Sequence, residues 1–98
     1  MSATEELLEK YEELTKEALA KAQAAEKLDA RAAIVLDMAA RYVSDAQYFK
    51  KKEDYPRALA AFSYAHGWLD AGARCKLFIV NDDHLFTVDA ETEDSDDS

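Results

Sequence analysis

The feature that most constrains this chain is a helical spacing of apolar residues that continues, with two short breaks, through its first 80 residues. In each stretch, apolar side chains recur every three or four positions, with charged residues between them. That spacing forms one apolar stripe along a helix and leaves the other faces to water. Only two glycines and one proline occur among the 98 residues, so few positions disfavour a helix. We therefore expect an all-α protein with one core.

The first helix is expected to begin at the N-terminus. Ser2 and Glu5 have the spacing of a capping box, in which each side chain binds the other residue's free backbone N–H. The stripe narrows to alanine towards its end, which would let a neighbouring helix approach closely. The predicted inward positions are Leu7, Tyr11, Leu14, Ala18, Ala22 and Ala25.

A second helix is predicted after Asp29, which can cap it, and should end near residues 50–52, three consecutive lysines. Lysines at this end would interact favourably with the partial negative charge of a helix C-terminus. The alternative interpretation of the three lysines is a binding patch for anions or nucleic acid. The predicted inward positions are Ile34, Val35, Met38, Tyr42, Val43, Ala46 and Phe49.

The third helix follows a short break at residues 53–56. Asp54 is a candidate cap, and Pro56 is tolerated in the first helical turn. So short a break makes the second and third helices antiparallel neighbours, and the third is expected to run to about Phe78. Its predicted inward positions are Leu59, Phe62, Ala65, Leu69, Ala73 and Leu77.

These signals predict an up-down-up three-helix bundle over residues 1–80. Residues 81–88 are expected to form an extended segment or hairpin, whose Leu85, Phe86 and Val88 would need the helices to pack against. Residues 89–98 are too polar to bury anything and are predicted to be a disordered acidic tail.

The net charge of −9 belongs mostly to the C-terminal end. Residues 81–98 contain eight acidic residues and no Lys or Arg, which leaves residues 1–80 with one net negative charge. Such a distribution offers no footprint for nucleic-acid phosphates, so no nucleic-acid partner is expected. The sequence contains no run of about 18 apolar residues, the length needed to cross a bilayer. Its start lacks the pattern of a secretory signal, and a single cysteine is consistent with a reducing compartment. We expect a cytoplasmic protein without a membrane partner.

The glycines are the unusual feature of the third helix. Gly67 and Gly72 both lie in its interior, where each costs roughly 1 kcal/mol relative to alanine. Small residues at Ser63, Gly67, Ala71 and Cys75 form a ridge at four-residue spacing. One hypothesis is a tight helix crossing; the other is a shallow groove under Trp68 for a ligand or a partner's side chain. Both predict that Gly67→Leu would be damaging.

A row of ionisable residues follows the same helix. His66, Asp70 and Arg74 recur every four residues, which indicates either an ion row or, less simply, a catalytic group. Adding Ser63 gives the residue types of a hydrolase triad, but neighbouring turns of one helix do not supply its geometry. His66, Cys75 and His84 lack a zinc spacing. We expect no catalytic residue, no metal and no cofactor.

The stretch YFKKKEDYPRALAAFSYAHGWLDAGARCKLF, followed by HLFTV, resembles a family of short archaeal proteins of unassigned function. SYAHGWLDAGAR is the most specific part of the match. The resemblance implies a helical bundle and brings no catalytic residues. EDYPRALAAFSYA is also similar to tetratricopeptide and microtubule-interacting-and-transport modules, and to HEPN domains. The nuclease members of the last group have an Arg and a His more closely spaced than any here, so that resemblance implies a non-catalytic member.

The leading hypothesis for function is a non-enzymatic interaction module that binds a protein, or a second copy of itself, through the third helix. Aromatic residues and Arg beside unusually small residues are typical of binding hot spots. The alternatives are a small-molecule or RNA-processing enzyme using His66, Asp70 and Arg74, and a HEPN-like regulatory partner of a nuclease. The candidate binding residues are Tyr64, His66, Gly67, Trp68, Asp70, Gly72 and Arg74.

Overall fold

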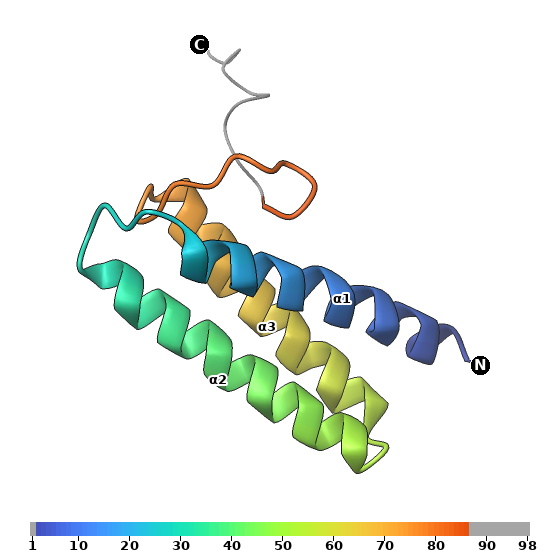
Figure 1. The fold of residues 1–98 in the computed structure, drawn as a ribbon. Helices are drawn as coiled ribbons and strands as arrows, with labels where there is room; N and C mark the ends of the chain where they lie inside the picture. The colour runs from blue at the N-terminus through green and yellow to red at the C-terminus, as the bar shows by residue number, and fades with distance from the viewer. Residues whose placement is uncertain (1, 87–98) are drawn as a thin grey trace.

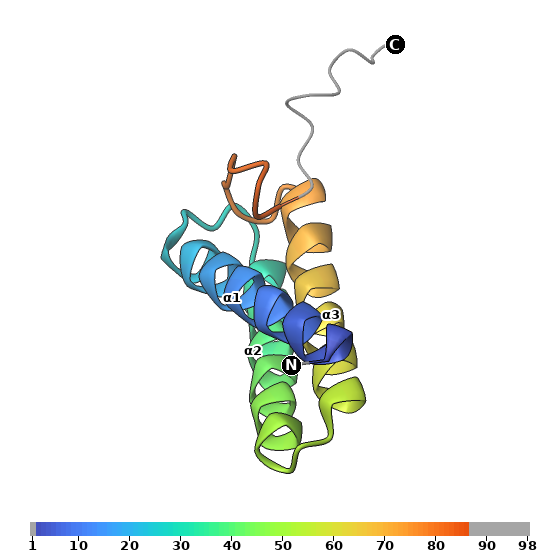
Figure 2. The same ribbon diagram turned by 90° about the vertical axis from the view of Figure 1, so that its right-hand side faces the viewer.

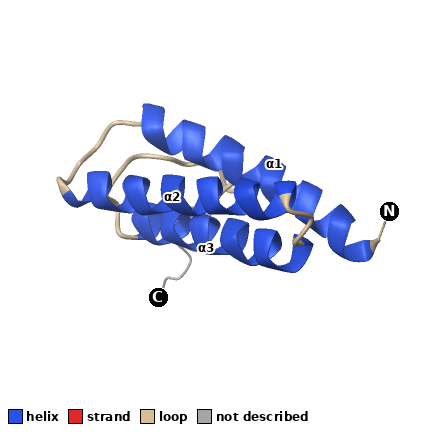
Figure 3. Ribbon diagram, turned by 90° about the horizontal axis from the view of Figure 1, so that it is seen from below, coloured by secondary structure: helices blue, strands red, loops and turns tan. Residues whose placement is uncertain are grey.

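Three antiparallel helices form the fold, in the predicted up-down-up order (Figure 1). The computed structural model describes residues 2–86, so Val88 and the predicted acidic tail lie outside the described residues. The helices are α1 (Ala3–Ala24), α2 (Arg31–Lys51) and α3 (Tyr55–Arg74). α3 packs against both other helices, whereas α1 and α2 contact each other little. Seen from below, the three helices run lengthwise across the view (Figure 3). The prediction of an all-α three-helix bundle is confirmed.

Two of the predicted helix starts have the expected hydrogen bonds. The backbone N–H of Ser2 donates to Oε1 of Glu5 at 2.8 Å, and the N–H of Glu5 donates to Oγ of Ser2 at 3.1 Å. At α3, Oδ1 of Asp54 accepts the N–H of Arg57 at 3.3 Å, and a proline occupies the first turn. Each cap satisfies a backbone donor that has no partner inside its helix.

The start of α2 differs from the prediction by one residue. Ala30 takes the cap position, and its side chain makes no capping hydrogen bond. Asp29 still satisfies the first turn, because its Oδ1 accepts the backbone N–H of Arg31 at 2.8 Å. The Arg31 guanidinium also pairs with this carboxylate, with Nη2 lying 2.7 Å from Oδ2.

We expect this pairing to be visible as a low pKa. The side-chain hydrogen bonds of Arg31, and then its backbone N–H, lower the pKa of Asp29 from an ordinary 3.8 to about 2. Because the folded pKa lies below the unfolded one, the stabilisation is present above about pH 3.8 and is lost as the pH falls towards 2. A carboxyl-detected NMR titration measures the value directly. A midpoint near 3.8, or an Arg31→Ala variant that titrates like the native chain, would contradict the assignment.

A residue with left-handed backbone lies two positions beyond the last helical residue of both α2 and α3. Glu53 has φ 60° and Lys76 has φ 58°, a region that usually favours glycine. In each case the next N–H turns back onto the helix: Asp54 donates to the Phe49 carbonyl at 2.9 Å, and Leu77 to the Gly72 carbonyl at 3.0 Å. The third helix therefore stops at Arg74, and its predicted extension to Phe78 is wrong because the chain reverses at Lys76.

The core lies along α3 and uses small residues where helices approach each other. Turned by 90°, α1 is seen to cross the pair formed by α2 and α3 at an angle (Figure 2). Most of the predicted inward positions of α3 are buried, and so are Ala18 and Ala22 of α1. At the start of α1 the prediction is wrong, because Leu8 is buried and Leu7 is exposed. Ile34 of α2 is also exposed, contrary to the prediction. The helix residues buried in the core are Leu8, Thr15, Ala18, Ala22, Ala32, Val35, Ala39, Val43, Ala46, Ala58, Ala61, Phe62, Ala65, Leu69, Gly72 and Ala73.

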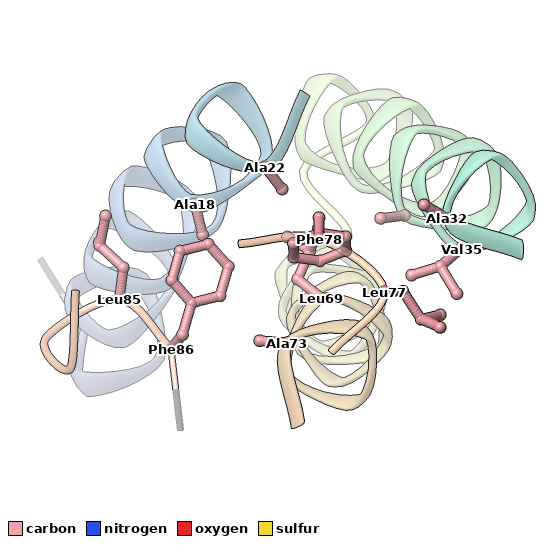
Figure 4. Close-up of a cluster of buried hydrophobic side chains, with 11 residues drawn as sticks. Ala18, Ala22, Ala32, Val35, Leu69, Ala73, Leu77, Phe78, Leu85 and Phe86 are labelled. Carbon is pink, nitrogen blue, oxygen red and sulfur yellow. The ribbon is translucent and has the colours of Figure 1, made fainter. Parts of the chain in front are cut away.

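After α3 the chain returns across the end of the bundle. The N–H of Leu28 donates to the Leu77 carbonyl at 2.8 Å, and the N–H of Ile79 donates to the Glu26 carbonyl at 3.0 Å. This single antiparallel bridge holds Phe78 in the centre of a buried cluster contributed by all three helices (Figure 4). Residues 77–79 thus complete the core that the helices leave open.

Residues 82–86 form a turn that lies over α1. The N–H groups of Leu85 and Phe86 both donate to the Asp82 carbonyl, and both side chains are buried in the same cluster as Phe78 (Figure 4). The Asp82 carboxylate lies 3.2 Å from Nζ of Lys21, and this hydrogen bond lowers the pKa of Asp82. The predicted hairpin does not form within residues 2–86. The predicted packing of this segment on the bundle is seen for Leu85 and Phe86.

None of the three helices in the described part of the chain has both the length and the apolar character needed to span a membrane.

Candidate functional site

The predicted site residues separate onto three sides of α3. Tyr64, Gly67 and Trp68 face outward, His66 and Asp70 lie towards α1, and Gly72 is buried towards α2. Arg74 is exposed in the last turn of the helix. The structure therefore does not bring the seven residues into one site.

A shallow hollow lies on the outward side of α3. It has a volume of about 360 Å³ and is lined by Ser63, Tyr64, Gly67, Trp68 and Ala71. Tyr64 is 63% exposed, although its ring stacks on Tyr42 of α2 with 5.1 Å between centroids and 13° between planes. Trp68 is partly buried and packs against the core. The stack and the core contact fix two aromatic side chains at the rim of the hollow.

Gly67 forms the open side of this hollow. Apart from its chain neighbours and the backbone of its own helix, a methyl group built at Gly67 would have no atom within 4 Å. A tight helix crossing inside the molecule is therefore wrong for this residue. The expectation that Gly67→Leu would be damaging then depends on the groove hypothesis alone. The ridge that includes Gly67 faces water at Ser63, Ala71 and Cys75 as well.

Gly72 has the opposite environment. A methyl group there would lie 2.6 Å from Cε2 of Phe78 and 3.0 Å from Cγ1 of Val35. Since real Cβ atoms do not approach other atoms so closely, the bare backbone is what lets the Phe78 ring lie against α3. The close-packing hypothesis therefore holds for Gly72, and the groove hypothesis describes Gly67.

His66 joins α1 to α3 through a residue that the sequence reasoning missed. Thr15 of α1 is fully buried, and its Oγ1 lies 3.3 Å from Nδ1 of His66 and 3.4 Å from the Phe62 carbonyl oxygen, to which it donates. On the other side of the ring, Nε2 of His66 lies 3.9 Å from Oδ1 of Asp70. Heptad spacing from Leu8 and Ala22, both buried, was the signal that could have identified Thr15.

This geometry is that of a polar contact between helices. Thr15 has no exposed surface, so its hydroxyl cannot meet a substrate. Ser63 uses its Oγ to donate to the Leu59 carbonyl of its own helix at 2.9 Å. A catalytic hypothesis needs His66, Asp70 and Arg74 to line a pocket. None of the three lines the hollow on α3. Within residues 2–86, no group of three or more His, Cys, Asp or Glu side chains is placed to hold a metal ion.

The lysines at the end of α2 make contacts within the protein. Nζ of Lys50 lies 2.6 Å from Oε1 of Glu12 on α1, and this hydrogen bond raises the pKa of Lys50. Nζ of Lys52 lies 5.7 Å from the centre of the Tyr48 ring. These contacts favour a structural role for at least two of the three cations over an anion-binding patch.

Comparison with known proteins identifies the family of the chain. No curated protein and no solved structure matches the chain. The model of the family described as "Protein of unknown function (DUF357)" matches residues 10–78, well over half of the chain. The matched region begins in α1, covers α2 and α3, and ends at Phe78, the residue that fills the centre of the core. The chain therefore belongs to the DUF357 family.

Proposed function

We propose that this protein is a non-enzymatic interaction module that binds a protein partner through the outer face of α3. We define this face by the exposed or partly exposed residues that follow the hollow along the helix. They are Ala60, Ser63, Tyr64, Gly67, Trp68, Ala71 and Cys75. Arg74 lies seven residues after Gly67 and ends the same side of the helix, Asp70 lies beside it, and Gly72 is part of the core and is not included.

The observation that carries the proposal is the open space beside Gly67. A glycine inside a helix costs roughly 1 kcal/mol relative to alanine. Gly72 offsets this cost by admitting the Phe78 ring, but nothing in the described chain approaches Gly67. Residues that break a local rule without a gain in the fold are typical of functional positions. A partner that approaches the backbone at Gly67 would supply the missing reason.

The chemistry around Gly67 supports a protein as the partner. Apart from Arg74 at its end, the face is uncharged, in a chain in which 34% of residues are charged. Tyr and Trp are the residues that most often dominate protein interfaces, where charged residues are depleted at the centre. Tyr64 and Trp68 also lose little side-chain entropy on binding, because the Tyr42 stack and the core already restrain them.

Affinity purification from native cells with matched baits tests this proposal. The native chain is compared with Ala71→Glu, which puts a charge into the hollow while keeping a good helix former at an exposed position. Leu28→Ser, at a 53% exposed leucine outside the face, is the control for a loss of exposed apolar surface. We expect the native and Leu28→Ser baits to recover the same protein, which can be an untagged copy of this chain. The Ala71→Glu bait should not recover it.

All three baits must show the same helical content by circular dichroism, so that a loss of binding is not a loss of fold. Direct binding of the recovered protein to each purified bait then gives the ratio of dissociation constants. If Ala71→Glu retains the same proteins with unchanged affinity, the outer face of α3 is not the binding surface.

A further inference from the structure

We propose that residues 80–86 form a strap that opens and closes while the three helices and Phe78 stay folded (Figure 1). Two apolar side chains and one ion pair hold the strap closed, and opening it uncovers apolar surface of the bundle. The strap lies over α1, so this inference does not depend on the proposed function of the outer face of α3.

The backbone of the strap is attached to the bundle only at its beginning. The last backbone hydrogen bond to the bundle joins the N–H of Ile79 to the Glu26 carbonyl, at 3.0 Å. Beyond it, the N–H groups of Leu85 and Phe86 donate to the Asp82 carbonyl, which belongs to the strap itself. Within residues 2–86, opening the strap therefore breaks no backbone hydrogen bond to the bundle.

Side chains hold the far end of the strap. Leu85 is 1% exposed and Phe86 is 3% exposed, and the Phe86 ring meets the Phe78 ring edge to face. The polar contact with α1 is the ion pair of Lys21 and Asp82, whose side chains are 49% and 32% exposed. An ion pair as open to water as this one contributes little, so the two apolar side chains dominate the closed state.

Between these two attachments the strap leaves space beside α1. A hollow of about 290 Å³ lies there, lined by Lys21, Ala24 and Ala25 of α1 and by residues 79–82. Side chains that face an empty space lack packing partners on that side and gain less dispersion energy. The middle of the strap therefore adds little to its attachment.

The balance of burial against chain entropy also favours opening. Closing orders the backbone of seven residues, yet Leu85 and Phe86 are the two of them that are fully buried. Phe78, in contrast, lies among side chains from all three helices and against Gly72. The family match also ends at Phe78, before the strap. A segment with so few buried contacts belongs to the least stable part of a structure, which opens without global unfolding.

Labelling of a buried thiol measures the opening. Leu85→Cys, combined with Cys75→Ser, places the chain's one thiol under the closed strap. Leu69→Cys in the same background is the matched control, because it makes the same truncation in the same buried cluster, but on α3. Each labelling rate is divided by that of the same variant unfolded in urea.

We expect the Leu85→Cys variant to be labelled at least ~100-fold faster than Leu69→Cys, because the strap opens far more often than the bundle unfolds. Its rate should change little with urea below the unfolding transition, since opening exposes little surface, whereas the rate of Leu69→Cys should rise steeply.

Two substitutions of neighbouring aspartates test the ion pair in the Leu85→Cys chain. Asp82→Asn removes the ion pair with Lys21 but keeps the side-chain oxygen that accepts the His84 N–H at 3.0 Å. Asp83→Asn changes the net charge equally at an exposed position. We expect Asp82→Asn to raise the labelling rate about 2–5-fold and Asp83→Asn to leave it unchanged. Equal rates would show that the ion pair does not hold the strap.

Hydrogen exchange of the native chain provides a second measurement, because Leu85→Cys itself shortens a side chain that holds the strap. The amide of Phe86 should exchange faster than that of Leu77, which donates to the Gly72 carbonyl, and with a smaller dependence on urea. Equal labelling of the two thiol variants with equal urea dependence, or equal protection of these two amides, would overturn the proposal. Residues 80–86 would then open only when the whole bundle unfolds.

Discussion

Replacing Phe78 with alanine is expected to lower the free energy of unfolding by about 3–5 kcal/mol. Phe78 follows α3, yet its ring is only 2% exposed and lies at the centre of the cluster formed by all three helices (Figure 4). The ring meets Phe86 edge to face, with centroids 6.4 Å apart, and closes over the bare backbone of Gly72. Truncation would leave a cavity that neither neighbour can fill. In a domain of this size the melting temperature should fall by at least about 12 °C.

The neighbouring Ile79 provides the control. Its side chain is 52% exposed, so Ile79→Ala should change the unfolding free energy by about 0.5 kcal/mol or less. Urea and thermal unfolding, followed by circular dichroism, measure both variants. Phe78→Leu, a milder truncation, keeps the comparison possible if Phe78→Ala does not fold. Equal effects at Phe78 and Ile79 would show that the segment after α3 is not part of the core.

Helix starts could be predicted from the sequence because their causes are local. The capping box at Ser2 and the Asp54 cap are hydrogen bonds between residues three positions apart, so the residue types and their spacing are enough. The same logic placed the cap of α2 one residue early, because the Asp29 carboxylate does bind the first turn, but from outside the helix.

The three lysines placed the end of α2 correctly, because the helix ends at Lys51, but the end of α3 could not be predicted in this way. The chain reverses at Glu53 and Lys76, which carry no sequence signal for left-handed backbone, while its two glycines lie inside α3. What fixes the end of α3 is a contact distant in sequence, the bridge between Phe78 and Lys27. From the sequence alone, the apolar run from Leu77 to Val80 fits a continued helix as well as an extended segment. Only the bridge to Lys27 decides between the two.

The two central observations of the candidate site also depend on tertiary contacts. Spacing alone placed Gly67 and Gly72 on α3 but could not show that one faces water and the other faces Phe78. Thr15 was missed because a threonine between Leu14 and Lys16 resembles a surface position. It lies seven residues after Leu8, which faces the core where Leu7 was expected to.

The same substitution at the two glycines is expected to change stability in opposite directions. Gly67→Ala should raise the free energy of unfolding by up to about 1 kcal/mol, because alanine favours the helix and its methyl group meets no atom. Gly72→Ala gains the same helix preference but forces the Phe78 ring and Val35 to move. Phe78 is buried and held by the bridge to Lys27, so overpacking should dominate and cost about 1–3 kcal/mol.

The two positions lie five residues apart in one helix, so the effect of each substitution on the unfolded chain is nearly the same and cancels in the comparison. Unfolding in urea at low micromolar concentration keeps the monomer dominant and isolates the fold from any self-association. Stabilisation by both substitutions would show that the Phe78 ring does not lie against Gly72. Destabilisation by Gly67→Ala would show that the backbone there is already in contact within the chain. The reason for a glycine at position 67 would then lie in the fold, and the argument for a partner at this face would fail.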